Sequence, residues 1–180
     1  MGPGGLVTFP DFSPSIPALT FFPRESHAVL LTELLSPERI RVPLAAHTKD
    51  ELLEELVDVL AQTQHVTDPS DVLRAVRARE EVLSTGIGSG VAIPHGRSAG
   101  IAELALVAGV SAGPVDFDAL DGRPARLFFL LVGPESAAGQ HVKMLSRLSR
   151  VLRREPVREA LMRARTPEEF YDILHEAEHT

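Results

Sequence analysis

Two uninterrupted apolar runs in the middle of the chain, residues 104–110 and 127–132, most constrain what this sequence can fold into. Both have the length of a strand and are far too short to cross a membrane. Neither run alternates apolar with polar residues, which is typical of a strand buried on both faces. Residues 91–93 are expected to form a third buried strand, and residues 40–42 and 115–117 are weaker strand candidates.

Helix patterns flank these strands on both sides. Residues 48–51 and 166–169 form capping boxes, and Asp68-Pro69 supplies a helix N-cap followed by a first-turn proline. Apolar residues with helical spacing follow each of these three starts, and a further helix is expected from about residue 140 to 153, broken near Pro156 and resuming to about 165. Connections between the strands are of hairpin length. The sequence therefore predicts an α/β fold, a single three-layer domain whose mixed central sheet has helices on both faces.

Residues 1–26 differ from the rest of the chain. They contain five prolines with four phenylalanines between them, a density of proline that prevents helices and central strands. We expect a flexible or surface-draped extension here, ahead of a domain over residues 27–180. Because four phenylalanines are unusual in a solvated tail, a docking arm for a partner is the alternative.

Composition excludes several classes of protein. With no cysteine, the chain can form no disulfide, thiolate zinc site or iron–sulfur cluster and cannot use thiol catalysis. A net charge of −7 argues against general nucleic-acid binding. No lysine or arginine precedes Arg24, so residues at the start do not resemble a secretory signal, and we expect a cytoplasmic protein with no direct membrane insertion.

One stretch is strongly basic inside this acidic chain. Residues 139–165 hold eight basic and two acidic side chains. Four of the basic residues fall at helical spacing on one face, Lys143, Arg147, Arg150 and Arg154. This basic stripe is either a solvated helix face or a docking surface for an acidic partner.

A glycine-rich turn at residues 84–90 superficially resembles a nucleotide-binding loop. Loops that bind phosphate groups lead into a helix N-terminus, whereas this one leads into the strand expected at 91–93. No Gly-Lys-Ser/Thr sequence follows. The turn is therefore not expected to bind a nucleotide, and no cofactor is expected.

The residues after this strand, Pro94-His95-Gly96-Arg97, provide the first candidate site residue. A proline that ends a strand and a glycine that permits close backbone approach hold the His95 imidazole at the mouth of the strand. Sites of α/β folds lie at such strand ends. Alone, a histidine in this place would more often be structural.

His141 and Arg79 are the other candidates. His141 shares a helix face with Leu145, Leu148 and Leu152, so it should point inward from the first turn, where free N–H groups and the helix dipole favour an anion. A core-edge histidine bonded to a carbonyl is the alternative. Arg79 ends the helix that begins at Asp68, and alone it would indicate only a solvated helix end.

Residues 80–97, with the run STGIGSGVAIPH at 84–95, resemble the signature of the fructose/mannitol/nitrogen-type enzyme IIA of the bacterial phosphotransferase system. The resemblance extends over residues 31–176 and includes Arg79-Glu80, the run FDALDG at 117–122 and Gln140-His141. Val142 stands where the family usually has leucine, and Ser89 where some sugar-specific members have a carboxylate.

The resemblance implies that His95 accepts a phosphoryl group on Nε2, supported by Arg79 and His141, with no metal or cofactor. It implies an HPr-like phosphocarrier protein as donor, and a IIB component or a regulated protein downstream. Two alternatives stay open: a regulatory binding module of the same fold, and a histidine metal site at His95 and His141, for which no Asp or Glu lies at typical ligand spacing. The sequence does not indicate an oligomeric state.

Overall fold

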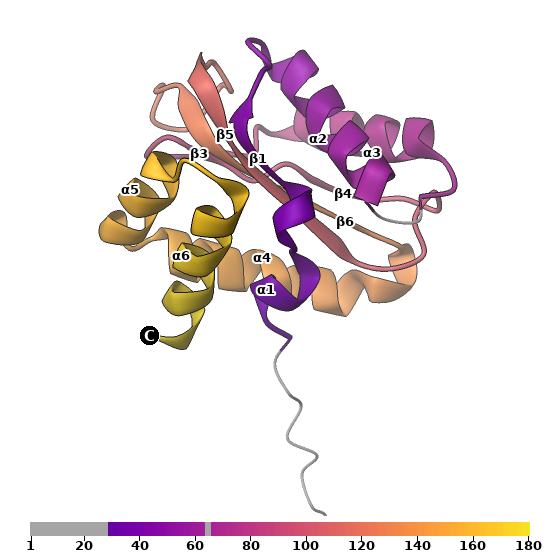
Figure 1. The fold of residues 1–180 in the computed structure, drawn as a ribbon. Helices are drawn as coiled ribbons and strands as arrows, with labels where there is room; N and C mark the ends of the chain where they lie inside the picture. Colours follow the sequence, from indigo (N-terminus) through magenta and orange to yellow (C-terminus); the bar gives the residue numbers. More distant parts are fainter. Residues whose placement is uncertain (1–28, 64–65) are drawn as a thin grey trace, which may run out of the picture.

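The computed structural model describes residues 29–63 and 66–180, so the extension at residues 1–26 lies outside the described residues. The first part of the chain forms α1 (Leu31–Leu34), a 3-10 turn (Pro37–Arg39), β1 (Ile40–Leu44), α2 (Lys49–Thr63) and α3 (Pro69–Val82). Three short strands follow, β2 (Gly86–Gly88), β3 (Val91–Ala92) and β4 (His95–Arg97), and then two long ones, β5 (Ala105–Val115) and β6 (Ala125–Gly133). A 3-10 turn (Glu135–Ala137), α4 (Ala138–Leu152), α5 (Glu155–Arg163) and α6 (Pro167–His179) complete the fold (Figure 1).

The sheet is mixed, as predicted. Its order is β1-β5-β6-β3-β2, and β4 also pairs with β6. The β5–β6 and β2–β3 pairs are antiparallel, whereas β1 runs parallel to β5, and both β3 and β4 run parallel to β6. The long β5–β6 pair is therefore the centre of the sheet, and the segment 91–97, which contains the candidate residue His95, lies along one side of β6.

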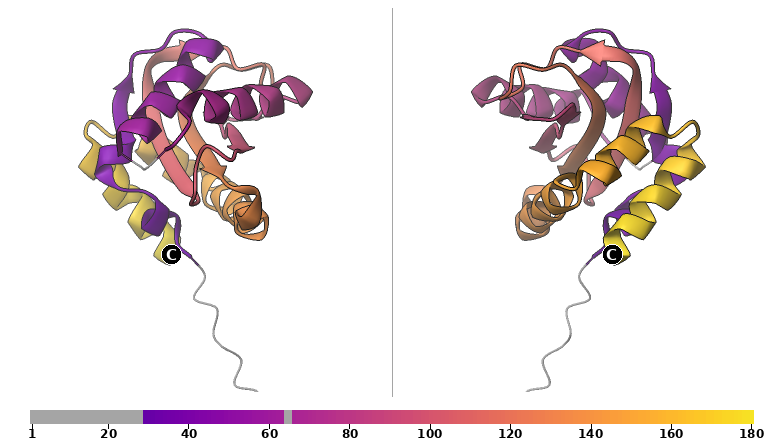
Figure 2. Two further views of the ribbon diagram at one scale, coloured as in Figure 1. Left: turned by 90° about the vertical axis from the view of Figure 1, so that its right-hand side faces the viewer. Right: turned by 90° about the vertical axis from the view of Figure 1, so that its left-hand side faces the viewer.

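Two apolar cores lie on the two faces of the sheet. In β6, Leu127, Phe129 and Leu131 belong to the core under α1, α4, α5 and α6, whereas Phe128 and Leu130 belong to the core under α2 and α3. This alternation follows from the two-residue period of a strand, and it explains why an all-apolar run is needed when both faces are covered. Figures 1 and 2 show the resulting three layers, which confirm the predicted fold class.

The predicted helix starts are confirmed by their caps. Asp68 Oδ1 accepts from the Asp71 N–H at 3.0 Å, and Thr166 Oγ1 accepts from the Glu169 N–H at 3.1 Å. At the third start the Glu51 carboxylate accepts from the Thr48 N–H at 3.3 Å. These contacts satisfy N–H groups that a helix leaves unpaired in its first turn.

One local prediction was wrong: the proline does not end the strand pairing. Pro94 lacks an N–H, but its carbonyl accepts from Leu131 N at 3.1 Å, and pairing with β6 resumes at once in β4. His95 therefore lies in a strand, not in the loop that follows one. Neither α1 nor β2 was predicted. Within residues 29–63 and 66–180, no helix has the length and apolar character needed to cross a membrane.

Candidate active site

His95 is held in a single orientation by the backbone beside it. Its Nδ1 lies 2.8 Å from the Ile93 carbonyl oxygen. Because a carbonyl can only accept, Nδ1 must carry the ring proton, and the lone pair of the neutral ring is then on Nε2. In this tautomer the half-buried imidazole can act as a base or nucleophile only through Nε2.

Helix α3 brings Arg79 to this histidine by packing directly on β4. A Cβ added at Gly96 would lie 3.1 Å from Val76 N, so any other residue would push the helix and the strand apart by a few tenths of an ångström. Arg79 is in the last turn of α3, where its Nη1 donates to the Leu83 carbonyl at 2.9 Å. Its guanidinium forms no ion pair with a carboxylate of the described residues and keeps further donors for an anion.

His141 enters from the opposite layer, in the first turn of α4. It is 5% exposed, as its position among the apolar residues of that helix predicts. Its ring centroid lies 5.8 Å from that of His95, with the ring planes inclined at 59°. Its Nδ1 is buried and has no hydrogen-bond partner among the described residues, which excludes the alternative of a histidine bonded through that atom to a carbonyl.

All three predicted residues line one depression of about 390 Å³ between α3, β4 and α4. Two further residues of its rim were missed, Arg97 and Glu135, whose side chains pair at 3.0 Å. Arg97 lies two positions after His95 in the same strand, and residues at that spacing share a face. This spacing would have indicated Arg97 only if residues 95–97 had been predicted as a strand.

The surroundings keep both histidines neutral near pH 7. Burial lowers the pKa of His95 and the Arg79 charge lowers it further, while the Ile93 hydrogen bond and the Glu80 charge oppose this. Burial, with smaller effects of His95 and Arg97, lowers the pKa of His141 to about 4. A neutral His95 has the lone pair that a nucleophile needs.

The glycine turn forms a tight hairpin between β2 and β3. Gly88, Ser89 and Gly90 all have positive φ, at 89°, 54° and 77°. The Ser89 N–H donates to the Asp121 carboxylate at 2.9 Å, so this loop is closed by a side chain of the chain itself. The loop leads into β3, as the sequence predicted, and not into a helix.

The four residues of the basic stripe are divided between two roles. Arg147 forms an ion pair of 2.8 Å with the buried Glu178 side chain and so connects α4 to α6. Arg154 lies between α4 and α5, and it donates to the Ala177 carbonyl of α6. Lys143 and Arg150 are exposed and have no ion-pair partner among the described residues. The docking prediction is now restricted to these two side chains.

A metal site at the two histidines lacks further ligands. Across residues 29–63 and 66–180, no group of three or more His, Cys, Asp or Glu side chains is arranged to hold a metal ion. Zinc sites in proteins ordinarily use at least three such ligands. The pair His95 and His141 does not fit this requirement.

Comparison with known proteins identifies the family. Residues 33–177 match the family described as "Phosphoenolpyruvate-dependent sugar phosphotransferase system, EIIA 2". The chain is 37% identical over 147 residues to the nitrogen regulatory protein of Pseudomonas aeruginosa, covering 81% of this chain and 95% of that one. It is 36% identical over 146 residues, 81% of this chain, to the fructose-specific EIIABC component of Bacillus subtilis, but spans only 23% of that longer protein.

Solved structures agree with this assignment. The crystal structure of nitrogen regulatory protein IIA-Ntr from Neisseria meningitidis has a TM-score of 0.74 and 37% identity, covering 80% of this chain and 98% of that one. Escherichia coli enzyme IIA for mannitol, solved in complex with phosphorylated enzyme IIB, has a TM-score of 0.69 over 79% of this chain and 97% of that one, and at 23% identity it supports the fold alone. The family match covers the whole described α/β domain except its two ends, and the chain therefore belongs to the EIIA 2 family of the phosphoenolpyruvate-dependent phosphotransferase system.

Proposed function

We propose that this protein is a phosphohistidine carrier in which His95 Nε2 accepts and returns a phosphoryl group. The observation that carries the proposal is the 2.8 Å contact between His95 Nδ1 and the Ile93 carbonyl, which leaves the lone pair on Nε2. The lowered pKa of His95 keeps that lone pair available at neutral pH. Phosphoryl transfer needs little more than in-line positioning and stabilisation of the negative charge on the transferred group.

Arg79 is the proposed anion contact. Its guanidinium lines the same depression as His95 and has donors left after its bond to the Leu83 carbonyl. A planar guanidinium can bind two phosphoryl oxygens through two parallel N–H groups, whereas a lysine ammonium acts as a point charge without that fixed geometry.

His141 is the proposed second donor. Its Nδ1 is buried without a partner, and a buried N–H without an acceptor is costly, so the proton of the neutral ring belongs on Nε2. In that tautomer His141 can donate from Nε2 to a phosphoryl oxygen while remaining uncharged.

The transfer itself balances without a nucleotide or metal. The His95 Nε2 lone pair forms a bond to phosphorus, and the nitrogen–phosphorus bond of a donor phosphohistidine breaks, returning its electron pair to the donor ring. The donor is an HPr-like phosphocarrier protein. In the forward step the same exchange passes the group to a IIB component, the kind of protein with which the Escherichia coli mannitol relative forms its complex.

A regulatory module is the second candidate. The relatives from Pseudomonas aeruginosa and Neisseria meningitidis that match over nearly their full length are nitrogen regulatory proteins. In this role the phosphoryl dianion on His95 changes the charge of the surface that a regulated partner contacts, and no onward transfer is needed.

The test is incubation with phosphoenolpyruvate, enzyme I and HPr, followed by mass spectrometry under alkaline conditions. One acid-labile phosphoryl group per chain, mapped to His95, is expected. His95→Ala should fold and take up none, whereas His175→Ala, which removes an exposed histidine from α6, should be labelled like the parent. Labelling of His95→Ala would contradict the assignment, with His141 the first residue to examine.

A further inference from the structure

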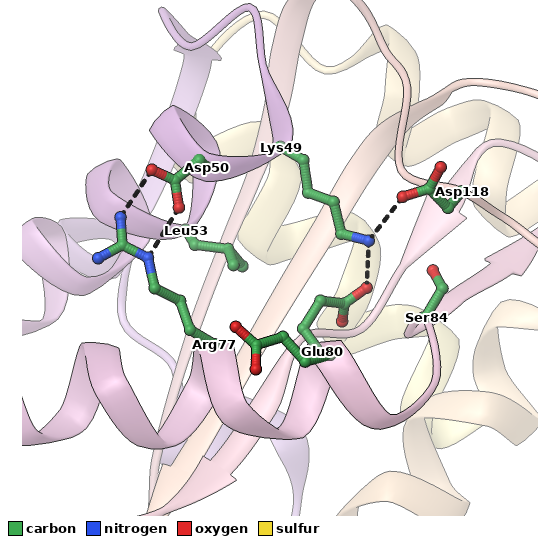
Figure 3. A pocket seen from close by; sticks show the side chains of 8 residues that line it. Lys49, Asp50, Leu53, Arg77, Glu80, Ser84 and Asp118 are labelled. Carbon is green, nitrogen blue, oxygen red and sulfur yellow. Dashed lines mark hydrogen bonds and ion pairs between the residues drawn. The ribbon is translucent and has the colours of Figure 1, made fainter.

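A second depression, of about 500 Å³, lies on the other side of α3 (Figure 3). Its central charges are matched within the chain: Lys49 Nζ lies 2.8 Å from Glu80 Oε1 and 3.1 Å from Asp118 Oδ2, and Arg77 pairs with Asp50 at 2.7 Å. Such internal pairing indicates a structural network, not a site for a charged ligand. One of its members, Glu80, directly follows Arg79 in the chain.

Glu80 is a buried carboxylate with every oxygen occupied. Its side chain is 5% exposed, and both oxygens lie 3.1 Å from the Thr85 N–H. The Thr85 hydroxyl donates to Oε2, and the Lys49 ammonium neutralises the charge. Burial alone would lower the pKa of Lys49, but its hydrogen bonds to Glu80 and Asp118 raise it, so the ammonium remains charged. A carboxylate buried without such partners would cost several kcal/mol.

A continuous chain of hydrogen bonds leads from this carboxylate to His95. Glu80 holds the Thr85 N–H, the Thr85 carbonyl accepts from Ile93 N at 3.0 Å, and the Ile93 carbonyl accepts from His95 Nδ1 at 2.8 Å. The next residue, Pro94, has a fixed φ that limits how far the Ile93 carbonyl can turn. The position of Thr85 therefore determines where that carbonyl points.

We propose that Glu80 is a positioning residue for His95: with its charge balanced by Lys49, it holds Thr85 and Ile93 so that the His95 proton stays on Nδ1. The inference rests on the proposed uptake of a phosphoryl group at Nε2. It assigns a purpose to a buried ion pair that forms no part of the depression around His95.

The same carboxylate acts on the charge of the ring during transfer. When the Nε2 lone pair bonds to phosphorus, Nδ1 keeps its proton and the imidazole becomes a cation. On onward transfer the nitrogen–phosphorus bond breaks, its electron pair returns to Nε2, and the ring is neutral again. Among the groups facing His95, the Arg79 charge opposes the cation, and the Glu80 charge and the Ile93 carbonyl favour it.

Glu80→Gln tests the proposal through the tautomer of His95 in unphosphorylated protein. Nitrogen-15 chemical shifts of the two ring nitrogens report which of them carries the proton. In the parent we expect Nδ1–H alone. In Glu80→Gln we expect a mixture with Nε2–H, together with phosphoryl uptake that is slower by ~10- to 100-fold, as for other misplaced catalytic groups.

Asp118→Asn is the matched control. It removes the other carboxylate bound to Lys49, leaves the Glu80 contacts in place, and puts asparagine at a residue whose φ of 51° asparagine tolerates. The parental tautomer and uptake rate are expected. If Glu80→Gln does not fold, Thr85→Val, which removes only the hydroxyl donor to Glu80, is measured in its place.

A folded Glu80→Gln protein with the parental tautomer would overturn the proposal, whatever its uptake rate, because slower uptake would then act through Arg79 or through stability. The tautomer is measured without a phosphoryl donor. Failure of the parent to take up phosphoryl groups would therefore count against the proposed function alone.

Discussion

Phosphorylation of His95 should raise the pKa of His141, which burial holds at about 4 in the free protein. The two ring centroids are 5.8 Å apart. The phosphoryl oxygens bring two negative charges and the His95 ring becomes a cation, so the net addition is one negative charge. At that distance and an effective dielectric constant of about 40 for an open depression, it favours a protonated His141 by about 1.4 kcal/mol, or about one pKa unit. The pKa of His141 should therefore reach about 5 in the phosphorylated protein.

The assay is an NMR titration of the imidazole Cε1–H resonances between pH 5.5 and 9, with and without the phosphoryl group. In the free protein the His141 resonance should stay constant over this range, because a group with a pKa of about 4 is already neutral. In the phosphorylated protein it should begin to titrate at the acidic end. The resonance of the exposed His175, on α6, is the internal control, and its chemical shift at each pH should not differ between the two forms. A constant His141 resonance in fully phosphorylated protein would refute the reasoning that its ring lies beside the bound group.

Four further outcomes are expected. Arg79→Ala should slow phosphoryl uptake by ~100- to 1,000-fold in a quenched-flow assay, with partial rescue by Arg79→Lys; parental rates in both would leave Arg79 as an ordinary helix end. Gly96→Ala should lower the free energy of unfolding by about 1–3 kcal/mol in urea titrations, because its methyl group would lie 3.1 Å from the backbone of α3. It should also slow phosphoryl uptake. An unchanged midpoint of urea unfolding would contradict that close packing. Between about pH 6.5 and 4 the unfolded chain binds a proton at His141 that the folded chain excludes, so the free energy of unfolding should fall as the pH is lowered through this window. The fall should be smaller in His141→Gln. Equal slopes of unfolding free energy against pH in the two proteins would count against a buried neutral ring. Reversing Lys143 and Arg150 to Glu should slow association with an acidic downstream partner in a salt-dependent way, without affecting phosphoryl uptake from HPr. Association rates equal to the parent's at low salt would show that both side chains are only solvated charges.

Local patterns predicted most of the fold correctly. The capping contacts at Asp68 and Thr166 involve residues three positions apart, so the sequence contains all that is needed to predict them. The apolar run in β6 likewise predicts a strand covered on both faces. Helix α1 could not be predicted in this way. It has four residues, and its Leu31 and Thr32 N–H groups donate to the Glu178 carboxylate, almost a whole chain length away.

The candidate site was predicted as a set of residue types and not as an arrangement. The family resemblance indicated His95, His141 and Arg79 as a set, and the structure places all three around one depression. The burial of Glu80 also had a signal that was not used: Val72, Val76 and Glu80 follow one another at intervals of four residues, so the acid falls on the buried face of α3. No pattern in the sequence indicated Lys49 as the partner of Glu80, because the two side chains are brought together only when α2 packs beside α3.

The sequence by itself determined the long apolar strands and the capped helix starts, because backbone propensity, capping and apolar periodicity act over a few neighbouring residues. Tertiary structure alone decided the chemical state of the site. The proton of His95 stays on Nδ1 because the Ile93 carbonyl points at it, and His141 is neutral because α4 buries it. Desolvation and charge pairing depend on groups that folding brings together from distant parts of the chain, and no local pattern records which groups those will be.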